Sequence, residues 1–243
     1  VLDKAKFMPE ARTIHNLRFV VSVGASLSED VGVGLQRVLG VPVLQQYGTA
    51  ETAQISANLP PPGAAKLGTC GIPPKNTVII VQEDGSQAAP GQRGEVWVRG
   101  PTVMSGYLGD PELNRAAFVD GWFRTGDIGS LDEDGFLTLH GREKELINRG
   151  GEKIAPTEID NALMRHPAVI EAAAYAVHHP RLGEDVAAAV VLKPGSTVTK
   201  EGLRKFLSTQ LASFKVPRHI VFRDKLPKGS TGKLQRKKLG DIS

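Results

Sequence analysis

The stretch that decides the fold is residues 121–160, GWFRTGDIGSLDEDGFLTLHGREKELINRGGEKIAPTEID. Asp127 stands at the end of an aromatic segment, and we expect its carboxylate to project from a tight turn. Asp134-Gly135 lies between apolar residues and predicts a β-hairpin, because this dipeptide favours the backbone of a two-residue turn. The first half of the stretch is therefore expected to be β structure.

The second half of the stretch predicts a turn followed by a helix. Gly150-Gly151 marks the turn. Pro156 suits the first position of a helix, where its missing N–H costs nothing. Glu158 then falls in the first helical turn, where a negative charge is favourable. This change from β structure to mixed α and β structure is typical of a junction between two domains.

The composition is that of a globular protein. Of its 243 residues, 40% are hydrophobic and 23% are charged, which allows one or two domains. The formal net charge of +4 suits an anionic small molecule and does not by itself indicate nucleic-acid binding. Cys70 is the single cysteine, so no internal disulfide forms, and we expect a reducing, cytoplasmic compartment. No run of apolar residues is long enough to predict a membrane span.

The amino-terminal part predicts a βαβ unit. Residues 17–23 are a continuous β-branched run, a helix is expected to end near Leu39, and residues 41–45 predict the next strand. Such a unit has parallel strands, and ligands of parallel sheets bind beyond the carboxyl ends of the strands. The residues expected at these two ends are Gly24, Ala25 and Ser26, and Gln46, Tyr47 and Gly48.

After this unit the pattern of expected secondary structure changes twice. Residues 59–63, LPPPG, break the first pattern, and up to residue 143 short β segments alternate with turns, which predicts an antiparallel sheet or a small barrel. The expected turns include Gly109-Asp110-Pro111. Beyond residue 144 the pattern is α+β, with a polar, basic tail from residue 224. Helices are expected over residues 157–165 and 199–211, and strands over residues 169–177, 185–192 and 219–222.

Four segments carry the most specific signal: residues 47–51 (YGTAE), 123–127 (FRTGD), 141–153 (GREKELINRGGEK) and 227–236 (PKGSTGKLQR). In this order and spacing they resemble motifs of the adenylate-forming superfamily, which includes acyl- and aryl-CoA synthetases, peptide-synthetase adenylation domains and luciferases. The resemblance runs from about residue 17 to residue 239. Four ordered motifs are far more specific than any one of them.

The first motif would hold nucleotide and metal. Taken alone, residues 47–51 are a strand end and a turn. The resemblance implies that the Tyr47 ring lies near adenine and that Glu51 helps to hold the Mg²⁺ of ATP, for which carboxylate oxygen is a suitable ligand. At Ala50 the family usually has a hydroxyl residue that touches phosphate, so either Thr49 or Thr52 is expected to replace it, or phosphate contact is weakened.

The second and third motifs extend this site. The resemblance implies that Asp127 accepts hydrogen bonds from the ribose hydroxyls, as a carboxylate can. It implies that Arg142 reaches ribose or phosphate, that Lys153 assists at phosphate, and that Lys144 is the hinge about which a carboxy-terminal domain rotates. It also implies that the Gly150-Gly151 turn approaches the pantetheine arm of CoA, because a turn without side chains permits close approach.

The fourth motif supplies the implied catalytic residue, Lys233. Without the resemblance, residues 227–236 would be a solvated basic tail or a nucleic-acid patch. The tail lacks interleaved aromatic residues for base stacking, so we expect no nucleic-acid partner.

The resemblance implies an α/β fold, the carboxy-terminal part of an adenylate-forming enzyme. Residues 1–143 would be part of the large AMP-binding domain, with a parallel βαβ portion over 1–58 and a small antiparallel β subdomain over 64–143. Residues 144–243 would be a small, mobile α+β domain that carries Lys233.

The implied activity is an ATP-dependent carboxylic acid:CoA ligase. It would convert a small carboxylic acid and ATP to acyl-AMP and pyrophosphate, and then acyl-AMP and coenzyme A to acyl-CoA and AMP, with Mg²⁺. Lys144 and the segment that follows it favour CoA over a carrier protein as acceptor, since peptide-synthetase domains usually have Asp at the hinge.

One departure limits this interpretation. No segment of residues 1–46 resembles the family's Ser/Thr/Gly-rich phosphate loop, and the chain starts at Val1 rather than Met. We therefore expect a truncated chain that lacks the amino-terminal half of the enzyme and is inactive by itself. The alternatives are a non-catalytic or split nucleotide- and CoA-binding partner, and an adenylation domain that loads a carrier protein.

Overall fold

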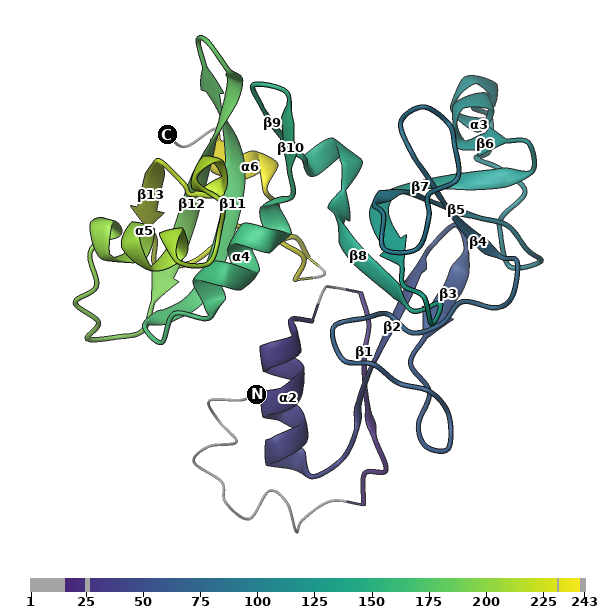
Figure 1. The fold of residues 1–243 in the computed structure, drawn as a ribbon, viewed down its shortest axis with the longest axis horizontal. Helices are drawn as coiled ribbons and strands as arrows, with labels where there is room; N and C mark the ends of the chain where they lie inside the picture. Colours follow the sequence, from purple (N-terminus) through teal and green to yellow (C-terminus); the bar gives the residue numbers. More distant parts are fainter. Residues whose placement is uncertain (1–15, 25–26, 231, 241–243) are drawn as a thin grey trace. The chain divides into compact units, whose positions relative to one another are not determined.

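The computed structural model describes residues 16–24, 27–230 and 232–240 (Figure 1). The chain divides into two units, Val1–Leu139 and His140–Ser243. The predicted domain boundary was placed after residue 143, four residues beyond this division. The helices of the described residues are all too short or too polar to cross a membrane.

The first unit begins with the expected βαβ arrangement. Strands β1 (Val20–Ser22) and β2 (Val43–Thr49) are parallel, and helix α2 (Glu29–Leu39) connects them. Helix α2 ends at Gly40, whose φ of 70° is the left-handed conformation that glycine adopts most readily. Strand β3 (Ala53–Ala57) pairs with β2 in the antiparallel sense, so this three-stranded sheet is mixed. Strand β3 was not predicted, because the turn that precedes it, residues 50–52, contains no Pro, Asn, Asp or Gly.

The second sheet of this unit is antiparallel, as predicted. Its strands are β4 (Val78–Val81), β5 (Gly94–Val98), β6 (Phe118–Val119), β7 (Trp122–Leu131) and β8 (Leu137–Arg142). Their order is β4-β5-β7-β6, and β8 also pairs with β7. The predicted turn at residues 109–111 includes Gly109, whose φ is 73°, and leads directly into an unpredicted short helix, α3 (Pro111–Ala117). The Asp110 side chain is the N-cap of this helix and accepts a hydrogen bond from the Leu113 N–H.

The second unit is an α+β domain. Its elements are η2 (Glu143–Glu145), β9 (Ile147–Arg149), β10 (Glu152–Ile154), α4 (Pro156–Met164), β11 (Val169–His179), β12 (Gly183–Leu192), α5 (Lys200–Ser208), η3 (Ser213–Lys215), β13 (His219–Phe222) and α6 (Lys237–Gly240), where η marks a 3-10 helix. The sheet order is β10-β9-β12-β11, and β13 is parallel to β12. Helices α4 and α5 cover one face of this sheet (Figure 1).

Both faces of β12 are buried, which explains its nearly continuous apolar sequence. One face packs against α4 and α5, through residues such as Val186 and Val190. The other face packs against Leu226 and Leu239 of the carboxy-terminal tail. The tail, which was interpreted as polar and basic, is therefore anchored by buried leucines.

Candidate functional site

Two predicted site residues meet in the first unit. The Tyr47 hydroxyl donates a hydrogen bond to Oδ2 of Asp127 at 2.5 Å, although the two residues are 80 positions apart in the sequence. Tyr47 is 8% exposed and Asp127 is 6% exposed. A buried carboxylate needs hydrogen-bond donors, and this hydroxyl is one of them. The structure thus brings the first and second motifs together.

The expectation that Asp127 projects from a tight turn was wrong, because Asp127 lies within the long strand β7. Arg124 is opposite Trp97 and Ile128 is opposite Glu95, so three residues of β7 face one residue of β5. This is a β-bulge, and Gly126 adopts the positive φ of 69° that it requires. Bulges redirect side chains, and this one sets the direction of Asp127.

Glu95 holds the bulge in place. Its carboxylate accepts hydrogen bonds from Arg124 Nε at 2.9 Å, from the Gly126 N–H at 3.1 Å and from Trp97 Nε1 at 2.8 Å. Glu95 was not among the predicted site residues. No motif marks it, since its partners are determined by the pairing of β5 with β7.

The turn after β2 decides between the two candidate threonines. Gly48 is required there, since an added Cβ would lie 2.1 Å from the Ala53 carbonyl oxygen. Thr52 is fully buried, and its hydroxyl accepts a hydrogen bond from the Thr49 N–H and lies 3.0 Å from the Thr49 hydroxyl. The Thr52 hydroxyl is therefore not accessible to phosphate, which leaves Thr49 as the candidate.

Glu51 lies on the same turn and is partly exposed. The Tyr107 hydroxyl donates to Glu51 Oε1 at 3.3 Å, and the Met104 N–H donates to the Glu51 carbonyl oxygen at 2.7 Å. Burial and then the Glu51 charge raise the pKa of Tyr107 above its ordinary value, so the phenol remains a donor. Tyr107 was not among the predicted site residues.

The described residues contain no group of three or more His, Cys, Asp or Glu side chains that could hold a metal ion. A single carboxylate such as Glu51 does fit Mg²⁺, which usually keeps waters and phosphate oxygens as its other ligands.

The remaining predicted residues of this unit are less informative. Gly24 follows β1 with a φ of 87°, whereas Ala25 and Ser26 lie outside the described residues. Gln46 and Tyr47 are neighbours in β2, so their side chains point to opposite faces of the strand. Gln46 is thus not on the face that carries the Tyr47–Asp127 pair.

In the second unit, the segment around the predicted hinge is tied to α4. Arg142 precedes η2, Lys144 is within it, and both side chains are exposed. The Thr157 hydroxyl donates to the His140 carbonyl oxygen at 2.6 Å. This segment is therefore held at its start by the first turn of α4.

Gly150 and Gly151 form the two-residue turn between β9 and β10, with Arg149 opposite Glu152. Their φ values of 59° and 95° fit a type I′ hairpin turn, which favours glycine at both positions. Lys153 follows on β10 and is exposed.

A buried ion pair fixes the base of this hairpin. Arg149 Nε lies 2.7 Å from Oδ1 of Asp185, which is almost fully buried. Burial alone would raise the pKa of Asp185, but Arg149 holds it below its ordinary value. The carboxylate therefore stays ionised and keeps Arg149 in place.

Lys233 lies on a loop of residues 227–235, which we call the lysine loop; within it, Thr231 is outside the described residues. The loop is closed by hydrogen bonds from the Gly229 N–H to the Lys233 carbonyl oxygen and from the Gln235 N–H to the Pro227 carbonyl oxygen. Lys233 is exposed, and its ammonium has no hydrogen bond or ion pair within the described part of the chain.

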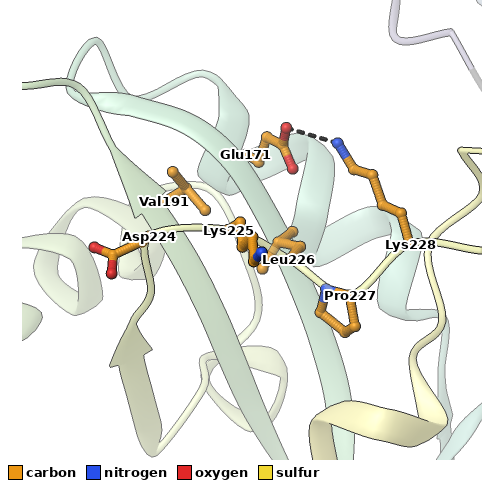
Figure 2. Close-up of a pocket in the computed structure, with 7 residues that line it drawn as sticks. All are labelled: Glu171, Val191, Asp224, Lys225, Leu226, Pro227 and Lys228. Atoms are coloured by element: carbon orange, nitrogen blue, oxygen red, sulfur yellow. Dashed lines mark hydrogen bonds and ion pairs between the residues drawn. The ribbon is translucent and has the colours of Figure 1, made fainter.

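A pocket of about 480 Å³ lies beside the start of the lysine loop (Figure 2). Its lining residues are Glu171, Val191, Asp224, Lys225, Leu226, Pro227 and Lys228. Lys228 Nζ contacts Glu171 Oε1 at 2.7 Å across its rim. None of the predicted site residues lines this pocket.

The lysine loop and the Gly150-Gly151 turn are attached at different places along β11, because Arg236, which follows the loop, contacts Ala174 in the middle of the strand and the turn lies beyond its far end. Lys228 contacts Glu171 near the start of the strand, whereas the Gly150 N–H donates to Leu182, in the turn that follows His179. The eight positions from Glu171 to His179 correspond to about 26 Å, at about 3.3 Å per residue.

Comparison with known proteins agrees with the resemblance to adenylate-forming enzymes. Residues 2–108 match the model of the AMP-binding enzyme family, and residues 158–233 match the model of the AMP-binding enzyme C-terminal domain. The chain belongs to the AMP-binding enzyme family. The resemblance to adenylate-forming enzymes is therefore confirmed, and so is the α/β fold class.

Curated AMP-binding enzymes similar to this chain are named as CoA ligases. Probable CoA ligase CCL9 of Humulus lupulus is 45% identical over 239 residues, which are 98% of this chain and 45% of that protein. Oxalate–CoA ligase of Arabidopsis thaliana is 43% identical, over 98% of this chain and 46% of that protein. The chain thus spans about half the length of the curated relatives that it matches.

Solved structures of AMP-binding enzymes show the same fold. ATP-bound MatB from Rhodopseudomonas palustris matches with a TM-score of 0.86 and 34% identity, over 92% of this chain and 45% of that chain. o-Succinylbenzoate CoA synthetase (MenE) from Bacillus subtilis, in complex with the acyl-adenylate intermediate OSB-AMP, has the same TM-score and identity, over 98% of this chain and 49% of that chain.

Proposed function

We propose that this chain forms the nucleotide-holding and lysine-bearing part of an ATP-dependent carboxylic acid:CoA ligase. The observation that carries the proposal is the buried Tyr47–Asp127 pair, which unites two family motifs from distant parts of the sequence. The names of the relatives support the same reaction class. The single, buried cysteine supports a reducing compartment, and we propose the cytoplasm.

The nucleotide is held mainly by residues of the first unit. Asp127 accepts hydrogen bonds from the ribose hydroxyls, and Tyr47 orients that carboxylate through its own hydroxyl. Thr49 contacts phosphate in place of the residue that Ala50 replaces. Gly24 and Gly48 let the backbone approach the nucleotide, and Arg142 and Lys153 add positive charge near ribose and phosphate.

The first half-reaction joins two anions, the substrate carboxylate and the α-phosphate of ATP. Lys233 places an ammonium where negative charge builds on the phosphate, and its exposed position leaves it available for this contact. Loss of one such preorganised donor typically costs about 10²–10³-fold in rate. When bound at Glu51, Mg²⁺ supplies further charge neutralisation at the phosphates.

The second half-reaction is attack of a thiol on the acyl carbon of acyl-AMP, with AMP as the leaving group. This step depends on positioning, which the Gly150-Gly151 turn provides for the pantetheine arm. Because the lysine loop is held at the first half of β11 and this turn lies beyond the far end of the strand, they act one after the other rather than together. Rotation about Lys144 exchanges them.

The identity of the acceptor rests on the relatives and the Gly-Gly turn. The similar sequences cited above are named as CoA ligases, which favours coenzyme A over a carrier protein. An amide bond synthetase, McbA from Marinactinospora thermotolerans, has the same fold at 36% identity and a TM-score of 0.85. The turnover assay described below therefore includes an amine as a second possible acceptor.

The proposal is tested by AMP binding and by turnover. Calorimetric titration of the chain with AMP should show saturable binding, which D127N weakens and Y107F does not. Pyrophosphate exchange and AMP release, measured with a panel of small carboxylic acids and CoA or an amine, then identify the reaction. Absence of AMP binding by a folded chain would contradict the proposed site. The isolated chain is expected to bind AMP without exchange, so exchange is compared between the chain alone and the chain with the amino-terminal half supplied.

A further inference from the structure

Arg236, three residues after Lys233, has a guanidinium that is nearly buried, with 13% of its side chain exposed. It donates to Asp160 Oδ2 at 2.5 Å, to Glu145 Oε2 at 3.1 Å and to the Ala174 carbonyl oxygen at 2.8 Å. All three contacts lie within the second unit. One side chain therefore joins the end of the lysine loop to three other segments.

These three segments have different roles. Glu145 is the last residue of η2 and directly follows Lys144, the proposed hinge. Asp160 belongs to α4, and its Oδ1 accepts a hydrogen bond from the Ala174 N–H at 2.6 Å. Ala174 lies in the middle of β11. Arg236 thus links the lysine loop to the hinge segment and to the buried framework of the domain.

We propose that Arg236 is a positioning residue, which holds the lysine loop and the hinge segment together as one rigid body. This inference rests on the proposed function, because Lys233 and Lys144 need a fixed relation only if the domain rotates. Lys233 then moves together with η2 when the domain rotates.

At the other flank of the lysine loop Leu226 is buried, but the polar contact is weaker. Lys228 and Glu171 form an ion pair, but their side chains are 46% and 35% exposed. Water and salt screen such a pair, so its contribution is small. The buried contacts of Arg236 are therefore the main polar anchor of the loop.

Lysine at position 236 would not replace the anchor. The planar guanidinium donates in several directions at once, whereas an ammonium on a flexible stem acts as a point charge. Burial alone would lower the pKa of Arg236, but Asp160 and Glu145 raise it, so the side chain remains charged and its donors persist.

The test is amide hydrogen exchange of the 243-residue chain without nucleotide. In R236A and in R236K, the amides of Gly229 and Gln235, which close the lysine loop, and of Leu146, which closes η2, should exchange at least ~10-fold faster than in the wild type. The Ala188 amide, in the buried strand β12, should be unchanged. K237A removes a neighbouring exposed charge and should change none of them.

A second variant keeps the proposal testable if R236A does not fold. E145A removes only the link to η2, so the Leu146 amide should exchange faster while the Gly229 and Gln235 amides change less. Wild-type exchange at all three amides in R236K would show that only charge is needed, and would overturn the proposal. Equal acceleration at Ala188 would show general destabilisation, and would overturn it as well. Since no nucleotide is present, neither result depends on whether the chain binds AMP.

Discussion

Thr157 and His140 are joined by a hydrogen bond, in which the Thr157 hydroxyl donates to the His140 carbonyl oxygen at 2.6 Å. The bond ties the residue at which the second unit begins to the first turn of α4. A rotation about Lys144 that leaves His140 with the first unit has to break it. Thr157 is thus expected to stabilise one of the two arrangements that the proposed reaction requires.

We predict that T157V loosens the segment from His140 to Lys144. One hydrogen bond contributes about 0.5–1.5 kcal/mol net, so the open state of the segment should become about 2–10-fold more populated. Limited trypsin digestion measures this as faster cleavage after Arg142 and Lys144. T157S retains the hydroxyl and is the matched control. Equal cleavage rates in T157V and T157S would show that the hydrogen bond does not restrain the hinge.

The Tyr47–Asp127 pair gives a second prediction, in which the two members have different effects. D127N removes the charged acceptor for ribose, and a hydrogen bond to a charged group contributes about 1.5–3 kcal/mol, so AMP should bind about 10–100-fold more weakly. Y47F leaves the buried carboxylate with one donor fewer, which should lower the free energy of unfolding by about 1–3 kcal/mol.

Calorimetry and urea denaturation separate these two effects. Y47F should lose more stability than D127N, and D127N should lose more affinity for AMP than Y47F. A D127N variant that binds AMP as tightly as the wild type would remove Asp127 from the nucleotide site.

The fold was largely predictable, because its signals are local. The β-branched run before α2, the proline at the start of α4 and the Gly150-Gly151 turn each specify a conformation through a few neighbouring residues. Strand β3 escaped prediction because Ala53 adopts a positive φ of 54°, which its sequence does not suggest.

The site was predictable only as far as its motifs extend. Tyr47, Asp127 and Lys233 stand in recognisable segments, whereas Glu95, Tyr107 and Asp160 acquire their roles from partners far away in the sequence. The pairing of β5 with β7 brings Glu95 to the bulge, and the folding of the tail onto β11 brings Arg236 to Asp160. Such partners depend on tertiary structure, which no local pattern specifies.

Lys233 gives a third prediction, which separates the two half-reactions. In the active enzyme, K233A should slow pyrophosphate exchange about 10²–10³-fold, because a preorganised charge is lost where the phosphate becomes more negative. Thioester formation from supplied acyl-AMP and CoA should be nearly unchanged. K237A is the control, since Lys237 is a neighbouring exposed lysine outside the lysine loop. An equal loss in both half-reactions would contradict the proposed exchange of the two loops.

Cys70 gives the last prediction, a pH dependence of stability. The thiol is 4% exposed, and burial raises its pKa from 9.0 to about 11. In the unfolded chain the thiol ionises from about pH 9, whereas in the folded chain it keeps its proton until about pH 11. The contribution to stability is therefore complete below pH 9 and is lost as the pH rises to 11. The stability lost relative to neutral pH amounts to about 1 kcal/mol at pH 10 and about 2–3 kcal/mol above pH 11.

Urea unfolding of the wild type and of C70A measures this contribution. The difference in unfolding free energy between the two proteins should be constant from pH 7 to about pH 8.5, because Cys70 is then protonated in both states of the wild type. It should fall by about 1 kcal/mol between pH 8.5 and pH 10, while the lysines, common to both proteins, cancel. A difference that stays constant to pH 10 would mean that the thiol ionises as easily in the folded chain as in the unfolded one. Cys70 would then not lie in the closed core that Tyr47 and Leu137 share with it.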